Sequence, residues 1–379
     1  MRVVIIADNL GENAPGIVFR NILEKLYDKL DFDLITSTFT YKHHPNHRGN
    51  LIKINQTRIK SWRIRTWLFK FFGYYHTQKK WAQKVQHILN ENDYDVVISF
   101  MSSTFYASVM AAAYFSYAKQ VKHICYCVDA VPAPFPWETD KAYSDAMKKF
   151  VRNYMRSVNV LCMTNKEMLD YEVSIINSSS IARVVLPNPP QKDTLQYLNF
   201  KRIEPYFVYA GKLYGIRTPD ALIRGFILFL KKCPNAKLIF VGSGKLEDYI
   251  RANFQQVIAN IVFLPYTSDL SSIYHQCIGL IDVNANIDND VFLSSKIISY
   301  LPYNRLIISE SGNGSPVRSV FGQSSTIIHV HHDPIDYLKA MDFCYNNYDN
   351  IDFSERVSYL SSMSSEAGTI KMMNCIMNK

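Results

Sequence analysis

The chain has 379 residues, and 48% of them are hydrophobic, which is ample for packed cores and predicts two or three domains. Its net charge of +9 favours a polyanionic partner, such as a nucleotide, a nucleic acid or an anionic lipid. No apolar run approaches the roughly 20 residues that span a bilayer, and the sequence starts directly with a strand, so we expect a cytoplasmic protein without a signal peptide.

The first half of the chain alternates short apolar runs with helical patterns. The expected strands cover residues 2–6, 32–35, 95–99, 123–128, 159–163 and 182–186. Their continuous apolar character is typical of central strands in a parallel sheet, and ligands bind at the carboxyl ends of such strands. We therefore predict an α/β domain whose candidate residues lie in the loops after these strands.

A basic and aromatic segment begins at Lys53 and ends at Lys84. It holds nine Lys and Arg residues and no Asp or Glu. Trp, Phe and Tyr stand between the cations at roughly helical spacing, which suits a helix in the headgroup layer of an anionic membrane. The alternative is an amphipathic helix that covers the sheet with its basic face in water. We expect no nucleic acid here, because no RNA- or DNA-binding motif accompanies the segment.

The loop 129–137 follows one of the expected strands and is stiffened by prolines. Its carboxylate, Asp129, could orient a substrate hydroxyl or take its proton. Alternatively, Asp129 caps the next turn through its own backbone. Trp137 could stack on a sugar or simply cover the core. Asp129 and Trp137 are therefore candidate substrate-binding residues.

A proline cluster at 187–190 and the polar stretch 191–204 predict an interdomain linker. The following half repeats the alternation, with expected strands at 206–209, 237–241, 262–264, 279–283 and 306–309. This order predicts a second parallel sheet. The final stretch, 354–379, predicts one or two helices.

Cationic and small residues gather at the carboxyl ends of the later strands. Gly211 lets the backbone turn after the first of them, and Lys212 and Arg217 follow in a loop that leads to a helix, an arrangement that binds anions. Arginine can grip phosphate oxygens with two hydrogen bonds. The turn Ser294-Ser295-Lys296 brings a further cation to the same edge. We predict a phosphate site, the alternative being a solvated basic loop.

Two clusters resemble metal sites without favouring one. A single residue separates Cys125 from Cys127, which is too close a spacing for the usual zinc pair. The seven cysteines are expected to be buried, reduced thiols. His331, His332 and Asp333 precede a proline, so we expect a turn there. The sequence predicts neither a metal nor another cofactor.

The order of motifs in the second half resembles the donor-binding half of GT-B glycosyltransferases. It is most similar to the mainly retaining family four, and within it to bacterial capsule and lipopolysaccharide enzymes. The motifs are G-K-L-x3-R from Gly211, K-L-I-F-V-G-S-G from Lys237, V-F-L-P from Val262 and S-S-K-I-x2-Y-L from Ser294. The resemblance implies two Rossmann-like α/β domains facing across a cleft, the second of which holds a nucleotide-diphospho-sugar.

The resemblance also implies roles for particular residues. Lys212 and Arg217 would bind the donor diphosphate and stabilise its charge as it leaves, so no metal is needed. The implied donor-site residues are Gly16, Gly211, Lys212, Arg217, Gly242, Gly244, Pro265, Tyr266, Asp290, Ser294, Ser295 and Lys296. Asp129 would act on the acceptor side, with Trp137 as a further candidate there.

The sequence departs from the family at two positions. The family carries two glutamates eight positions apart, and their places here are Val291 and Ser299. Asp288 or Asp290 is near enough to substitute for the first, and Ser294 or Lys296 could contact the ribose or the diphosphate. The family implies a retaining reaction, but the missing carboxylates leave this outcome open.

We predict a GT-B protein with domains at 1–190 and 205–353, the linker 191–204, and a C-terminal segment, 354–379, that crosses back to the first domain. The predicted reaction moves a sugar from a nucleotide-diphospho-sugar to a saccharide or lipid-linked acceptor, in bacterial surface polysaccharide synthesis at the inner face of the plasma membrane. One alternative is a degenerate, non-catalytic binding or scaffold subunit. Another is a nucleotide-sugar epimerase of the same fold.

Overall fold

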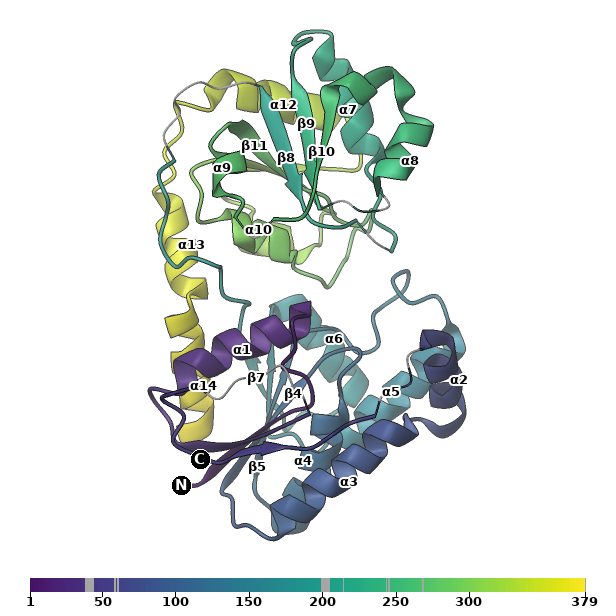
Figure 1. Cartoon of the computed structure of the whole chain (residues 1–379), viewed down its shortest axis with the longest axis vertical. Helices are drawn as coiled ribbons and strands as arrows, with labels where there is room; N and C mark the ends of the chain where they lie inside the picture. The colour runs from purple at the N-terminus through teal and green to yellow at the C-terminus, as the bar shows by residue number, and fades with distance from the viewer. Residues whose placement is uncertain are drawn as a thin grey trace. The chain divides into compact units, whose positions relative to one another are not determined.

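The computed structural model describes residues 1–37, 44–57, 59, 61–198, 205–213, 215–242, 244, 246–267 and 269–378. The chain divides into two compact units, one formed by Met1–Pro189 with Ser365–Lys379 and the other by Pro190–Ser364. Part of the expected linker, 199–204, lies outside the described residues. In the C-terminal segment, α13 (Glu355–Met363) belongs to the second unit and α14 (Ser365–Met377) to the first (Figure 1).

The first unit is built on a seven-stranded parallel sheet with the order β3-β2-β1-β4-β5-β6-β7. The strands are β1 (Val3–Ala7), β2 (Phe32–Thr36), β3 (Leu51–Lys53), β4 (Val96–Met101), β5 (Lys122–Cys127), β6 (Val160–Met163) and β7 (Ala182–Val185). The central strands β1 and β4 are buried along their whole length, as their continuous apolar character predicts. The edge strand β3 is too short to show a period in the sequence.

Helices cover both faces of this sheet (Figure 1). The described helices of this unit are α1 (Ala14–Leu26), α2 (Trp62–Phe72), which packs on α5 rather than on the sheet, α3 (His76–Asn90), α4 (Ala107–Lys119), α5 (Lys141–Met155), α6 (Lys166–Ile176) and α14. The single helix expected from the basic and aromatic segment is divided into α2 and α3. The cause is Gly73, which ends α2 with a φ of 71°, a conformation that favours glycine.

The second unit is built on a six-stranded parallel sheet with the order β10-β9-β8-β11-β12-β13. The strands are β8 (Tyr206–Ala210), β9 (Lys237–Val241), β10 (Ile261–Leu264), β11 (Cys277–Asp282), β12 (Leu306–Glu310) and β13 (Ile327–Val330). The helices are α7 (Asp220–Leu230), α8 (Leu246–Asn253), the short 3-10 helix η1 (Gln255–Asn260), α9 (Ser271–Tyr274), α10 (Ser295–Tyr300), α11 (Pro316–Phe321), α12 (Pro334–Asn347) and α13.

The helices α7 and α12 pack closely on one face of the second sheet (Figure 1). Gly225 of α7 permits this approach, because a Cβ at that position would lie 2.7 Å from the carbonyl oxygen of Pro334. Phe226 and Tyr337 are buried in the same core cluster. The helices cover the faces of the sheet, and the loops at its carboxyl edge carry the predicted phosphate-binding residues.

Both sheets reverse their strand order beside their first strand, between β1 and β4 and between β8 and β11. In open parallel sheets, ligands bind at the carboxyl ends of strands that flank such a reversal. The loop after β8 holds Lys212 and Arg217, and the loop after β11 leads to Lys296. The predicted cations therefore belong to the reversal point of the second sheet.

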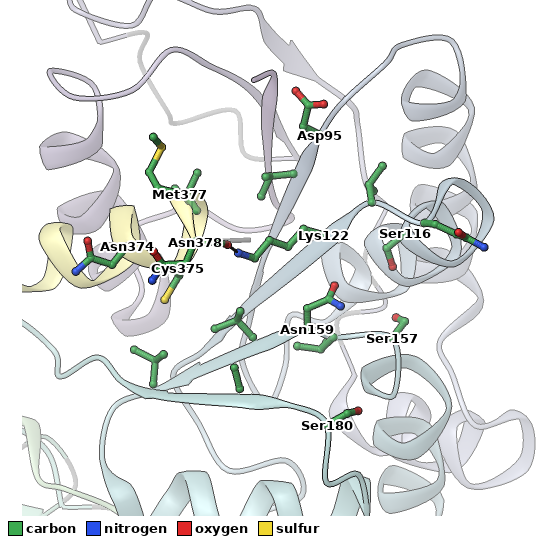
Figure 2. A pocket seen from close by; sticks show the side chains of 18 of the residues that line it. Asp95, Ser116, Lys122, Ser157, Asn159, Ser180, Asn374, Cys375, Met377 and Asn378 are labelled. Carbon is green, nitrogen blue, oxygen red and sulfur yellow. Dashed lines mark hydrogen bonds between the residues drawn. The ribbon is translucent and has the colours of Figure 1, made fainter.

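A cavity of about 1310 Å³ lies at the other edge of the first sheet, where β4 to β7 begin (Figure 2). Lys122, Asn159, Cys375 and Asn378 are among its lining residues, and the Lys122 side chain bonds to the carbonyl oxygen of Asn378. The cavity contains none of the predicted site residues.

Candidate functional site

Lys296 and Gly211 meet at the reversal point of the second sheet, although they are far apart in the sequence. Gly211 has a φ of 122°, and its N–H donates to the carbonyl oxygen of Val241 at 2.8 Å. A Cβ at Gly211 would lie 2.9 Å from Cε of Lys296. The Lys296 ammonium lies 5.1 Å from the centre of the Tyr209 ring, within the range of a cation–π contact. The turn after β8 therefore holds the Lys296 side chain.

The charge on Lys296 is perturbed by its surroundings. Burial lowers the pKa of Lys296 to about 8; the carboxylate of Asp282 acts to raise it and the guanidinium of Arg217 to lower it. Arg217 is therefore close enough to repel Lys296. A bound polyanion would relieve this repulsion.

Lys212 differs from these two cations. Its side chain is exposed, and its backbone carbonyl accepts a hydrogen bond from the Tyr209 hydroxyl at 3.2 Å. Tyr209 thus ties the loop to β8 while leaving the Lys212 ammonium in water. The charge of Arg217 thus acts on Lys296, whereas the Lys212 side chain is exposed.

The Ser294 turn is directed inward. Ser294 is buried and caps α10, accepting a hydrogen bond from the N–H of Lys296 at 3.3 Å. Its hydroxyl donates to Oδ1 of Asp282 at 2.6 Å. Ser295 is exposed at the first position of α10. Ser294 thus holds the backbone that carries Lys296.

A second pair of loops flanks β9. Gly242 has a φ of 72°, and a Cβ there would lie 3.6 Å from Tyr266. Gly244 also has a positive φ, of 57°. Pro265 and Tyr266 are exposed, with Tyr266 82% accessible. The exposed ring of Tyr266, beside the turn at Gly242, offers a flat surface on which a base could stack.

Asp290 and the places of the two missing glutamates lie in the loop after β11 and in α10. Asp290 is buried, and its Oδ1 accepts hydrogen bonds from the backbone N–H groups of Val291 (2.8 Å) and Phe292 (3.3 Å). Val291 is itself buried, while the Ser299 hydroxyl donates to the carbonyl oxygen of Lys296. Asp290 thus stabilises its own loop, and Ser299 a turn of α10.

Two buried carboxylates at this edge have no signal in the sequence motifs. Asp282 ends β11 and accepts three hydrogen bonds. Glu310 ends β12, and its carboxylate is bonded by the Tyr337 hydroxyl (2.7 Å) and by Nδ1 of His332 (3.0 Å). Asn284 connects the two, donating to Asp282 and to the carbonyl oxygen of Glu310, both at 2.9 Å. An acidic residue that ends an apolar strand is the only sequence feature that could have indicated them.

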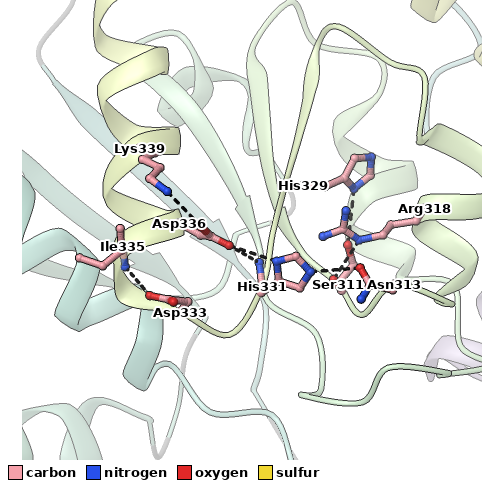
Figure 3. Close-up of polar contacts among 9 residues, drawn as sticks. All are labelled: Ser311, Asn313, Arg318, His329, His331, Asp333, Ile335, Asp336 and Lys339. Carbon is pink, nitrogen blue, oxygen red and sulfur yellow. Dashed lines mark hydrogen bonds and ion pairs between the residues drawn. The ribbon is translucent and has the colours of Figure 1, made fainter.

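The histidine cluster after β13 is held by hydrogen bonds (Figure 3). His331 contacts Oδ2 of Asp336 through Nδ1 and Oδ1 of Asn313 through Nε2, both at 3.1 Å. Asp333 caps α12, accepting from the N–H of Ile335 at 2.7 Å. Within the described ranges, no group of three His, Cys, Asp or Glu residues could hold a metal ion. His331, His332 and Asp333 form the short connection from β13 to α12, in which the N–H of Asp333 donates to the carbonyl oxygen of His331 at 2.7 Å.

In the first unit, Gly16 and Asp129 lie after β1 and β5, at the carboxyl edge of the sheet. Gly16 packs on Gly11, since a Cβ at Gly16 would lie 2.3 Å from the Gly11 carbonyl oxygen. Asp129 is partly buried and accepts hydrogen bonds from the backbone N–H and the hydroxyl of Ser103, both at 3.0 Å. Burial raises the pKa of Asp129, and the Ser103 bonds offset part of the rise. Trp137 is partly exposed in the same proline-rich loop.

Glu172 of α6 is hydrogen-bonded to this loop and makes the stability of the first unit depend on pH. It is fully buried, and its Oε2 accepts a hydrogen bond from the N–H of Val131 at 3.0 Å. Burial raises the pKa of Glu172 from 4.5 to about 8. The carboxyl group is therefore protonated in the fold at pH 7, whereas the unfolded chain ionises it. The contribution of Glu172 to the free energy of unfolding is therefore greatest below pH 4.5. It falls as the pH rises from 4.5 to 8.

Glu172→Gln is expected to remove this pH dependence, because the amide stays neutral. Relative to the parent protein, the variant should gain about 3 kcal/mol of unfolding free energy between pH 4.5 and pH 7. Urea unfolding of the first unit at both pH values measures the gain. Glu24→Gln, on the exposed side of α1, is the matched control and should change nothing. Parallel pH profiles for the parent and Glu172→Gln would refute the assignment.

No family model matches the chain, and no curated protein matches its sequence. Solved structures do match it. Alr3699/HepE of Anabaena in complex with UDP matches over 100% of both chains with 9% identity and a TM-score of 0.68. The lipopolysaccharide outer core galactosyltransferase WaaB in its apo form matches over 99% of both chains, with 11% identity and a TM-score of 0.68.

A third matching structure is a putative UDP-N-acetylglucosamine 2-epimerase from Listeria monocytogenes. It has 9% identity, a TM-score of 0.61, and coverage of 99% of this chain and 95% of that one. At such identities the likeness concerns the fold. With its two parallel sheets of seven and six strands, the chain has the α/β fold of GT-B glycosyltransferases, as its sequence predicts.

Proposed function

We propose that the protein is a glycosyltransferase that binds a nucleotide-diphospho-sugar at the carboxyl edge of the second sheet. The observation that carries the proposal is Lys296, held over Gly211 with the charge of Arg217 beside it. A diphosphate is the ligand that such a pair of cations would accept. The structures of HepE with UDP and with UDP-glucose support this choice, since that protein shares the fold.

The proposed chemistry is electrostatic. When the bond between the sugar and the diphosphate breaks, negative charge grows on the departing phosphate oxygens, and cations already in place stabilise it. Lys296 and Arg217 would do so from the reversal point, and Lys212 from the rim of the loop. Tyr266, beside Gly242, would lie against the nucleotide base. Asp290 and Ser294 would hold the loops that carry these groups.

The acceptor is proposed to be a saccharide or a lipid-linked saccharide. Asp129 would orient the attacking hydroxyl and take its proton. Its raised pKa suits a group that exchanges protons nearer to neutral pH than an ordinary aspartate. Trp137 would stack on a sugar ring. The sequence motifs support family four and surface polysaccharide synthesis as the setting.

A non-catalytic binding subunit is the second candidate, favoured by the two missing glutamates. Valine at 291 and serine at 299 have no carboxylate to offer a sugar. Val291 is moreover buried, and Ser299 bonds within its own helix. Such a subunit would bind the nucleotide-sugar without turnover. An epimerase would turn the nucleotide-sugar over without any acceptor. Incubating the donor with and without acceptor membranes separates the three activities.

Nucleotide binding is tested by thermal unfolding with UDP-, GDP-, CMP- and dTDP-sugars. A ligand at 100 times its dissociation constant should stabilise the fold by about 2.7 kcal/mol. Arg217→Ala should abolish most of this shift, and Lys212→Ala should reduce it less, because Lys212 is exposed. Lys232→Ala, at an exposed ion pair with Asp342, is the control. A shift that survives both loop substitutions would contradict the proposed diphosphate site.

The proposal extends to an anionic membrane surface, contacted by α2 from the cytoplasmic side. Ile64, Trp67 and Phe71 are exposed at helical spacing, with Trp67 56% and Phe71 70% accessible and their rings 4.7 Å apart. Arg63 is exposed beside this stripe, and Lys70, next to it, is paired with Asp140. An outward aromatic stripe edged by cations suits a helix that lies in the headgroup layer. No helix in the described part of the chain is long and apolar enough to cross a bilayer.

The double variant Trp67→Ala, Phe71→Ala is expected to lower the affinity for anionic vesicles at least about tenfold, because burying one large apolar side chain contributes about 1.5–3 kcal/mol. Cosedimentation with phosphatidylglycerol vesicles measures the loss. Tyr117→Ala, another exposed aromatic residue of the first unit, is the matched control. If the parent protein and the double variant bind the vesicles equally, α2 is an ordinary solvent-facing helix and not a membrane contact.

A further inference from the structure

Asp282 is a fully buried carboxylate at the carboxyl end of β11, where the strand order of the second sheet reverses. Its Oδ1 accepts a hydrogen bond from the Ser294 hydroxyl at 2.6 Å. Its Oδ2 accepts from Nδ2 of Asn284 at 2.9 Å and from the Ser309 hydroxyl at 3.0 Å. All three donors are neutral, so they satisfy the carboxylate without cancelling its charge.

The negative charge of Asp282 therefore acts on its surroundings, and Lys296 is among the groups whose pKa it raises, with Glu310, His329, Tyr300 and Tyr337. Lys296 lies two residues after Ser294, whose hydroxyl is shared between Asp282 and the backbone N–H of Lys296. The charge of Asp282 opposes the effect that burial has on Lys296. One side chain thus acts both on the backbone and on the charge of the same lysine.

The groups around the Lys296 ammonium come from three elements. The Tyr209 ring contacts it from β8, Arg217 repels it from the loop after β8, and Asp282 attracts it from β11. Burial and Arg217 both favour the neutral amine, and of these three groups only Asp282 carries a negative charge. The charge of Lys296 near neutral pH therefore depends on this carboxylate.

We propose that Asp282 is a positioning residue of the diphosphate site, which keeps Lys296 cationic and, through Ser294, fixes the start of α10 from which Lys296 extends. The inference rests on the proposed function only where it calls the site a diphosphate site. Asp282 is fully buried, so it would act on the ligand only through Lys296. A neutral amine at Lys296 would offer a phosphate one weak donor in place of a full charge.

The first test measures the charge of Lys296 in the protein alone. The full chain is labelled with an amine-reactive acylating reagent across a pH series, and the Lys296 peptide is quantified by mass spectrometry. In the parent protein the labelling midpoint is expected near pH 8. In Asp282→Asn it should fall by about one pH unit or more, since an opposite charge shifts a neighbouring pKa by about 1–3 units. A parent midpoint at the ordinary lysine value would overturn the proposal without any variant.

Two further variants separate the charge of Asp282 from its hydrogen bonds. Ser309→Ala removes one donor to Asp282 but keeps the carboxylate, so the labelling midpoint should stay within a few tenths of the parent value. Asp248→Asn, on the exposed face of α8, controls for the loss of a remote charge and should also leave it unchanged. If Ser309→Ala moves the midpoint as far as Asp282→Asn does, the effect is one of packing and the proposal fails.

The second test measures binding of inorganic pyrophosphate by calorimetry at pH 7 and pH 9. The parent protein should bind more weakly at pH 9, and Asp282→Asn should already bind at least about twofold more weakly at pH 7, because a midpoint one unit lower leaves only about half of Lys296 charged there. If neither protein binds pyrophosphate or a nucleotide-sugar while the labelling midpoint still shifts, the proposed function fails and the link between Asp282 and Lys296 stands. If both proteins bind pyrophosphate equally at both pH values, Asp282 does not position the site.

Discussion

Lys296→Met is expected to lower kcat for sugar transfer by about 10²- to 10³-fold, the usual effect of removing one group that stabilises a developing anion. Methionine keeps the unbranched stem that packs on Gly211 and Tyr209, so the change removes a charge and little else. Burial of Lys296 costs the fold up to about 3 kcal/mol below pH 8, and this cost fades between pH 8 and pH 10.5. The variant should therefore lose most of its activity and yet be at least as stable as the parent protein.

This combination separates a functional lysine from a structural one. Steady-state transfer assays and urea unfolding of the second unit, both at pH 7, provide the two measurements. Lys339→Met, on the exposed side of α12, is the matched control and should alter neither quantity. A Lys296→Met protein that keeps full activity would remove the main support of the proposed site. A protein that loses activity and stability together would indicate a structural role.

Arg356→Met is expected to destabilise the second unit by about 4 kcal/mol or more, because it removes four hydrogen bonds that a buried, charged guanidinium donates. Arg356 is fully buried at the start of α13. Its guanidinium donates to the carbonyl oxygens of Tyr303, Arg305 (2.6 Å) and Thr326 (3.0 Å), and to the Thr326 hydroxyl (2.9 Å). These bonds join α13 to the connection between α10 and β12 and to Thr326, which directly precedes β13.

The loss should appear in urea unfolding monitored in the second unit, with the first unit unaffected. Arg251→Met provides the contrast, since Arg251 pairs with Glu247 on the exposed face of α8 and such a pair contributes about 1 kcal/mol or less. If both substitutions cost the same, the buried hydrogen bonds of Arg356 contribute no more than a surface ion pair. A neighbouring carboxylate, Glu355, accepts from the backbone N–H of Thr326 at 3.0 Å and stays intact in the variant.

The regular part of the fold could be predicted because its strands are continuous apolar runs bounded by turn residues. β8, β9 and β12 begin and end within two residues of the expected positions. The division between α2 and α3 could not be predicted with the same certainty, since helical spacing continues on both sides of Gly73 and only the left-handed backbone there ends the first helix. β3 is three residues long, too short to carry a period.

The candidate site was predictable in its residue types and less so in its contacts. Arg217 and Lys296 were expected at one edge, and the charge of Arg217 lowers the pKa of Lys296 in the structure. Ser294 and Asp290 were expected to contact the ligand, but both make hydrogen bonds to their own surroundings. Polar side chains in a βα loop look alike in sequence whether they point to a ligand or stabilise the loop.

The sequence by itself determined the class of fold, because alternating apolar strands and helices can bury their surfaces only as parallel sheets with helices on both faces. It also determined which edge of the second sheet is cationic. Only the tertiary structure decided that Lys296 lies over Gly211 and that Asp282 acts on it from within. The reason is that burial and charge coupling act through space, between residues that strand order brings together and that no local pattern connects.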